Sequence, residues 1–132
     1  ELWLSRGDQI DAIARVVRSP GAANRSEIAQ LAESVIAFWD EYEIEPKGIL
    51  LAQTWFSKTP AERTDPDFTP ALQEFAGKKN LCLMSSLQLL GMYKDLEMGG
   101  MPVEEMRKRM LETNGRLMGF TLDNNLAPGQ TV

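Results

Sequence analysis

The sequence predicts an α/β domain with a mixed central sheet, flanking helices and a C-terminal helical pair. Two apolar runs, GILLAQT at residues 48–54 and NLCLMS at 80–85, are typical of strands that helices cover on both faces. Between residues 26 and 42 the apolar side chains recur at steps of three and four, which indicates an amphipathic helix. Strands that alternate with helices in this way favour a layered α/β arrangement.

The first half of the chain should form a hairpin, a helix and a central strand. The turn-forming residues Arg6-Gly7-Asp8 lie between the extended segments LWLS and IDAIARVVR, which predicts an antiparallel hairpin. A helix follows, with Asn24 or Ser26 as its N-cap, and Pro46 ends the connection to the first apolar strand. We expect the helix to pack on one sheet in which three strands are neighbours, at residues 10–18, 48–54 and 81–84.

The second half should contain a long loop, a short helix, a buried strand and two more helices. The loop covers residues 55–67 and has little periodicity, which is typical of segments that carry function more often than structure. PALQEFAGKK indicates the short helix, and SLQLLGMYKDLEMGG and PVEEMRKRMLETNG indicate the helical pair. RLMGF at 116–120 predicts a short edge strand. We assign residues 1–122 to one domain and 123–132 to a flexible tail.

Composition limits the chemistry of this chain. It has 132 residues, a net charge of −5 and no histidine, which excludes serine-triad and papain-like mechanisms and the usual zinc sites. The single cysteine, Cys82, lies in an apolar run and should pack in the core. There is no signal peptide and no apolar run of ~18 residues, so we expect a soluble, cytoplasmic protein. The first residue is Glu1 rather than methionine, and we expect the chain to be part of a larger protein.

Five short motifs follow one another along the chain. They are QL at 30–31, KGILL at 47–51, TPAER at 59–63, DFTP at 67–70 and LCLMSSLQLL at 81–90. Their order resembles one group of predicted nucleases with the restriction-endonuclease-like fold, the PD-(D/E)xK superfamily. In that group a Gln-Leu helix precedes a Lys-Gly-Ile-Leu strand, a Pro-x-x-Glu-Arg loop, Phe-Pro or Phe-Thr-Pro, and a Cys-Leu-Leu-Thr-Thr strand that runs into Leu-Gln-Leu-Leu. The resemblance implies a mixed central sheet flanked by helices.

The chain departs from this family at the metal site. In such nucleases two acids bind divalent ions, and a lysine two residues beyond the second acid lies on the same strand face. By resemblance Glu1 falls near the first acid, Val16 at the second acid and Arg18 at the lysine, while Gln30 keeps the helix glutamine. Valine offers no oxygen to a hard cation, and arginine holds its proton too firmly for general base work. The resemblance therefore implies a degenerate site with no metal and no cofactor.

An active nuclease with rearranged acids is the alternative. Glu27 lies one turn before Gln30 on the same side of the predicted helix, so it is the best candidate for a migrated ligand. Asp11 should lie on the strand face opposite the second-acid position, because side chains alternate along a strand. Glu1, Glu27 and Gln30 gathered around Arg18 would make a site that depends on Mg²⁺ or Mn²⁺. Each of these residues also fits a plain structural role.

Binding without cleavage is a separate possibility. Lysine and arginine are dispersed against an acidic total, so the chain lacks the footprint of a basic DNA-binding domain. Trp55 and Phe56, at the mouth of the long loop, are candidate contact residues, although aromatic residues more often anchor a core or a loop. The seven methionines suit adaptable surfaces. We therefore expect a binding or assembly module that takes a protein partner or associates with itself, with no membrane and no small-molecule cofactor.

Overall fold

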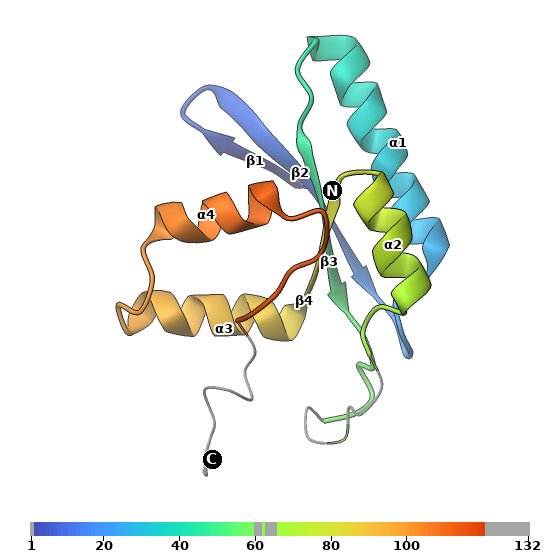
Figure 1. Ribbon diagram of the computed structural model, residues 1–132, viewed down its shortest axis with the longest axis vertical. Helices are drawn as coiled ribbons and strands as arrows, with labels where there is room; N and C mark the ends of the chain where they lie inside the picture. Colours follow the sequence, from blue (N-terminus) through green and yellow to red (C-terminus); the bar gives the residue numbers. More distant parts are fainter. Residues whose placement is uncertain (1, 60–61, 63–65, 121–132) are drawn as a thin grey trace.

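The computed structural model describes residues 2–59, 62 and 66–120, and within them one sheet and four helices form the regular structure. Figure 1 shows the sheet running between two pairs of helices. The elements in chain order are β1 (Leu2–Arg6), β2 (Gln9–Arg18), α1 (Arg25–Tyr42), β3 (Lys47–Gln53), α2 (Pro70–Lys78), β4 (Leu81–Ser85), α3 (Ser86–Glu97), α4 (Val103–Glu112) and β5 (Gly115–Arg116).

The five strands form a mixed sheet in the order β1-β2-β3-β4-β5. β1 and β2 are antiparallel, as the turn-forming letters between them predict, whereas β2, β3, β4 and β5 are parallel. The strands predicted at residues 10–18, 48–54 and 81–84 correspond to β2, β3 and β4, which lie side by side. The structure therefore confirms the predicted α/β class, with a mixed sheet flanked by helices.

Helices cover both faces of the sheet. On one face α1 and α2 pack over a core that includes the fully buried residues Ile13, Leu31 and Leu50. On the other face α3 and α4 contribute Met92 and Met106 to a second core. Alternate residues of the central strands enter different cores, since side chains alternate along a strand. The predicted C-terminal helical pair is α3 and α4, which Figure 1 shows on the side of the sheet away from α1 and α2.

The edge strand near the end of the described chain is shorter than the sequence predicts. β5 covers only Gly115–Arg116 instead of residues 116–120. Gly119 has a φ of +86°, a left-handed conformation that strands do not use. Gln88 of α3 donates from Nε2 to the carbonyl oxygens of Leu117 at 2.7 Å and Gly119 at 3.0 Å. The Leu117 amide still donates to the Leu83 carbonyl oxygen of β4 at 2.8 Å, but a buried side chain satisfies the carbonyl groups of Leu117 and Gly119.

Two predictions fall wholly or partly outside the described residues. The tail at 123–132, with the domain limit at 122, lies outside them, and so do residues 60–61 and 63–65 of the long loop. The described start of that loop is a turn, in which the Lys58 amide donates to the Trp55 carbonyl oxygen at 2.9 Å. Trp55 takes a left-handed φ of +49° at this turn.

Cys82 has the core position that the sequence predicts. Its side chain is fully buried on β4, on the sheet face that α3 and α4 cover. Burial raises the pKa of the Cys82 thiol from 9.0 to about 11, although the nearby positive charge of Lys47 acts in the opposite direction. The thiol is therefore protonated throughout the neutral range.

We expect this thiol to make the domain less stable at alkaline pH. The folded pKa lies above the ordinary value, so the stabilisation is complete below pH 9.0 and is lost as the pH rises through about 11. Between about pH 8 and pH 11 the free energy of unfolding should fall by about 2 kcal/mol more in the wild-type protein than in Cys82→Ala. Urea unfolding followed by circular dichroism would measure both proteins. The same pH dependence in the two would contradict this expectation.

Candidate functional site

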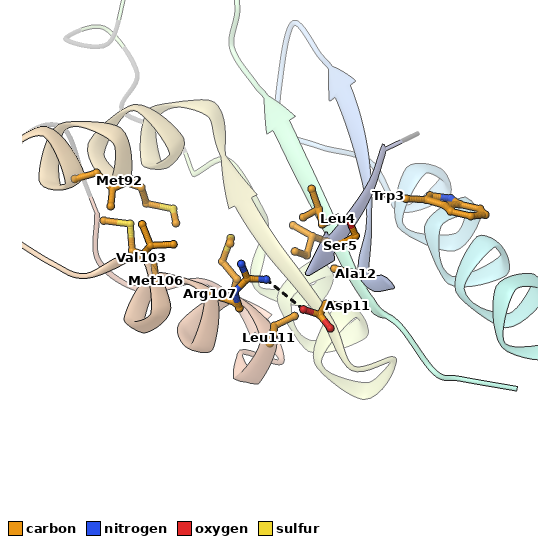
Figure 2. A pocket seen from close by; sticks show the side chains of 13 residues that line it. Trp3, Leu4, Ser5, Asp11, Ala12, Met92, Val103, Met106, Arg107 and Leu111 are labelled. Carbon is orange, nitrogen blue, oxygen red and sulfur yellow. Dashed lines mark hydrogen bonds and ion pairs between the residues drawn. The ribbon is translucent and has the colours of Figure 1, made fainter. Parts of the chain in front are cut away.

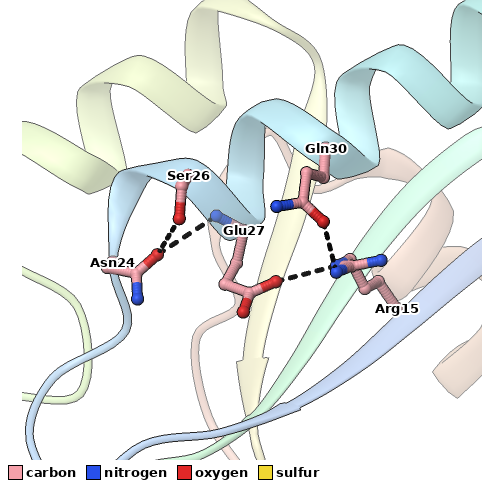
Figure 3. A network of polar contacts seen from close by, with 5 residues as sticks. All are labelled: Arg15, Asn24, Ser26, Glu27 and Gln30. Atoms are coloured by element: carbon pink, nitrogen blue, oxygen red, sulfur yellow. Dashed lines mark hydrogen bonds and ion pairs between the residues drawn. The ribbon is translucent and has the colours of Figure 1, made fainter.

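Arg15, Glu27 and Gln30 form a polar network between β2 and α1. Arg15 donates from Nε to Glu27 Oε1 at 2.9 Å and from Nη2 to Gln30 Oε1 at 2.5 Å. Figure 3 shows the guanidinium group of Arg15 facing both side chains of the helix. The side chains of Arg15 and Glu27 are 29% and 27% exposed, so the ion pair lies at the surface of the α1 layer rather than in its core.

The start of α1 sets the positions of the two helical members. Asn24 is the N-cap, one of the two caps that the sequence allows, and its side-chain oxygen accepts from the Glu27 amide at 3.2 Å. It also accepts from the Ser26 hydroxyl at 2.6 Å. Glu27 and Gln30 are three residues apart and therefore share one face of the first turns, the face toward β2.

Val16 and Arg18 lie away from this network. Because side chains alternate along β2, Arg15 faces α1 while Val16 and Arg18 face the opposite side of the sheet. Val16 is 55% exposed. The guanidinium carbon of Arg18 lies 4.2 Å from the centre of the Phe56 ring, a cation–π contact that joins the end of β2 to the long loop.

The structure thus brings together only part of the predicted set. Glu27 and Gln30 do converge on β2, but they meet Arg15 and not Arg18. The physical reason is the strand period of two, which places residues three apart on opposite faces. Glu1 lies outside the described residues. Sequence reasoning missed Arg15, although its distance of two residues from Ile13 and Val17 places it on the α1 face.

A β-bulge changes the direction of Asp11. The register between β1 and β2 shifts between Leu4 and Ser5, so that Asp11 is the extra residue of β2. Its carboxylate oxygen Oδ2 lies 3.2 Å from Nη1 of Arg107, on α4. Simple alternation predicted that Asp11 faces away from the side of Val16, and this prediction is wrong because the bulge shifts the alternation by one residue.

Trp55 anchors the long loop, and Phe56 is its more accessible aromatic residue. The indole Nε1 of Trp55 donates to the carbonyl oxygen of Pro66 at 3.2 Å, and Lys58 Nζ lies 5.1 Å from the ring centre. Phe56 is 37% exposed and carries the Arg18 contact. Within the described part of the chain, no group of three or more aspartate, glutamate or cysteine side chains is placed to hold a metal ion.

β1 is an apolar strand at the edge of the sheet. Among the described strands it pairs only with β2. Leu2, Trp3 and Leu4 are 54%, 49% and 38% exposed. Trp3 lies on the α1 face, with its ring centre 5.1 Å from Phe38 and 6.0 Å from Tyr42 in edge-on contacts. The run of three apolar residues predicts a strand, but it does not show that the strand lies at an edge.

A hollow of about 350 Å³ opens between the β1–β2 hairpin, α3 and α4 (Figure 2). We call it the methionine hollow. Its polar members include Asp11 and Arg107, which Figure 2 shows paired with each other. The apolar side chains that line it include Leu4, Ile49, Met92, Leu96, Met106 and Met110.

A second hollow, of about 630 Å³, lies on the opposite face of the hairpin, beside the end of α1. We call it the aromatic hollow, because Trp3, Phe38 and Tyr42 line it. Ile44 and Asp8 also line it. The edge strand β1 therefore lines both hollows, with Trp3, Leu4 and Ser5 at the methionine hollow and Trp3 again at the aromatic hollow.

Comparison with known proteins adds no relative to this description, since no family model, no curated protein and no solved structure matches the chain. None of the helices that the structure describes is both long and apolar enough to cross a bilayer. The chemistry of the chain therefore has to be inferred from its own surfaces.

Proposed function

We propose that this chain is a polypeptide-binding module on a restriction-endonuclease-like scaffold whose metal site is degenerate. The observation that carries the proposal is β1, an edge strand whose Leu2, Trp3 and Leu4 are 38–54% exposed. An apolar edge of this kind offers open backbone groups and apolar side chains to a strand of another chain. A cytoplasmic location belongs to the same proposal, because the single cysteine is a buried thiol and not half of a disulfide.

The surroundings of the expected metal position support a role without catalysis. Val16, where the resemblance places the second acid, offers only carbon atoms to a cation. Glu27 and Gln30 already accept hydrogen bonds from Arg15. A divalent ion at these two side chains would have to displace both bonds and lie beside a positive charge, so its lost hydration would go uncompensated.

We expect neither saturable binding of Mn²⁺ nor metal-dependent cleavage of single- or double-stranded DNA or RNA. One carboxylate that is paired with arginine provides too little negative charge for a hard cation. Calorimetric titration with millimolar Mn²⁺, beside gel assays on the four nucleic-acid substrates, would measure both properties.

The alternative of a nuclease with rearranged acids predicts a different pattern. Saturable Mn²⁺ binding and cleavage, both lost in Glu27→Gln, would establish that alternative and end the proposal. Glu33→Gln is the matched control, since Glu33 is an exposed glutamate on the same helix. A genuine metal site at Glu27 would survive Glu33→Gln, whereas a diffuse attraction of cations to an acidic protein would respond equally to both substitutions.

A further inference from the structure

We infer that β1 accepts an extended strand from a partner polypeptide, with large apolar side chains on both faces of the strand and a basic residue near the β1–β2 turn. This inference rests on the proposed function and names its partner. It follows from the open edge of the sheet, from the two hollows and from the charges that line them.

The open edge determines the conformation of the partner. β1 has β2 on one side, and no other described strand lies on its other side. Alternate backbone N–H and C=O groups along an outer edge point away from the sheet, where a further strand satisfies them. Soluble proteins usually protect such edges with charged residues, prolines or a covering element. Leu2, Trp3 and Leu4 supply three successive apolar residues instead.

The two hollows determine which side chains the partner carries. Side chains of an added strand would point alternately to the two faces of the sheet. Those on one face would reach the methionine hollow beside Leu4, and those on the other would reach the aromatic hollow beside Trp3. Methionine side chains adapt to different apolar shapes, and aromatic rings offer broad apolar contact. The partner strand should therefore be apolar at successive positions, and not only at every second one.

The charges of the two hollows differ. In the methionine hollow Asp11 and Arg107 form an ion pair with each other, so an uncharged side chain suits this face. Asp8, an acidic residue of the hairpin turn, is among the residues that line the aromatic hollow. A lysine or arginine of the partner at that end would complement it.

A second copy of this chain fits less well than a different polypeptide. Each copy carries a net charge of −5, so two copies repel each other at low salt. Two β1 strands related by a two-fold axis would also be antiparallel, which puts their hairpin turns at opposite ends. Asp8 of one copy would then lie beside the Leu2 end of β1 in the other copy. The surfaces thus favour a partner with its own basic residue.

The test uses a fluorescent peptide of sequence KTVLVFVTS, which is apolar on both faces and carries one lysine. Two further peptides have the lysine at the other end or glutamate in its place. Fluorescence anisotropy in metal-free buffer should show saturable binding of one lysine peptide to the whole chain, at least fivefold tighter than the glutamate peptide. Which of the two lysine peptides binds more tightly shows the direction in which the added strand runs along β1. Asp8→Asn should reduce the lysine preference to less than twofold.

Substitutions at the edge locate the binding. Leu2→Lys/Leu4→Lys should lower the affinity for the peptide at least tenfold, because charge on an edge strand opposes pairing with another strand. Leu89→Lys/Leu90→Lys is the matched control, with two leucines of α3 that are 45% and 53% exposed, and it should change affinity less than twofold. Circular dichroism would check the fold, and Leu2→Lys alone serves if the double variant unfolds.

Three results would overturn the inference. Absence of saturable binding by all three peptides would do so. Loss of binding in the α3 variant but not in the β1 variant would move the partner to another face, which leaves the proposed function standing. A dimer in sedimentation equilibrium that Leu2→Lys/Leu4→Lys abolishes would make the occupant a second copy. Metal-dependent cleavage, in contrast, would end the proposed function whatever the peptides do.

Discussion

Gly91→Ala should destabilise the domain by about 3 kcal/mol, whereas Gly77→Ala should stabilise it slightly. A Cβ atom at Gly91 would lie 2.2 Å from the backbone oxygen of Phe120 and 2.8 Å from its carbonyl carbon. Backbone atoms cannot rotate away as the end of a flexible side chain can. The segment after β5 would therefore have to leave α3, and it would take with it the two hydrogen bonds that Gln88 donates.

Gly77, near the end of α2, is the matched control. A Cβ atom there would meet the Asn114 carbonyl oxygen at 3.6 Å, an ordinary van der Waals contact. Alanine lowers the conformational entropy of the unfolded chain relative to glycine, so Gly77→Ala should gain about 0.5 kcal/mol. Urea unfolding of both variants would give the two values. If Gly91→Ala is as stable as the wild-type protein, the segment from Leu117 to Phe120 does not pack on α3 as the structure has it.

The α/β class and the mixed sheet flanked by helices could be predicted from the sequence because their signals are local and strong. The apolar runs that became β3 and β4 are too short for helices and are covered on both faces. Asn24 lies directly before the apolar periodicity of α1, where it caps the helix. The β5 prediction was too long, since the left-handed residues at 119 and 120 and the hydrogen bonds from Gln88 depend on contacts that are distant in sequence.

Which side chains meet at the candidate site depends on the bulge in β2 and on how α1 crosses β2. Only the bulge leaves a signal in the sequence. Ile10 and Ile13 both pack on the α1 side of the sheet, although they are three residues apart. Strict alternation would place them on opposite faces, so their spacing was the signal for the bulge at Asp11. The pairing of Arg15 with Glu27 also depends on how α1 crosses β2, a packing angle that side chains from both elements decide together.

The β1 edge could not be recognised from the hairpin pattern alone. LWLS is typical of a strand whether the strand is central or at an edge, because strand propensity does not report the number of neighbours. Only the order of the sheet shows that β1 has β2 on one side and, among the described strands, no neighbour on the other. The resemblance to nucleases rests on motifs that begin at Gln30, so it says nothing about the surroundings of this strand.

Asp11→Ala should lower the free energy of unfolding by about 3 kcal/mol, because Arg107 then keeps only a longer contact, 3.8 Å from its Nε to Oε1 of Glu104, whose side chain is 72% exposed. The Asp11 side chain is only 9% exposed, and that of Arg107 is 27% exposed. Partial access of Arg107 to water keeps the loss at the lower end of the range for buried pairs. Chemical unfolding monitored by fluorescence of the tryptophans would measure the change.

A double-mutant cycle of Asp11→Ala, Arg107→Met and the two together separates the ion pair from the packing of its side chains. Asp11→Ala/Arg107→Met should lose only about 1 kcal/mol, since methionine fills the methionine hollow and no charge remains uncompensated. Glu105→Ala is the matched control on α4, because the Arg109–Glu105 pair spans 3.3 Å with side chains 45% and 44% exposed, and its loss should stay below about 0.5 kcal/mol. If Asp11→Ala costs no more than Glu105→Ala, water already solvates Arg107. The ion pair would then add little to the stability of the domain, and the contact between the hairpin and α4 would depend on the apolar side chains of the methionine hollow.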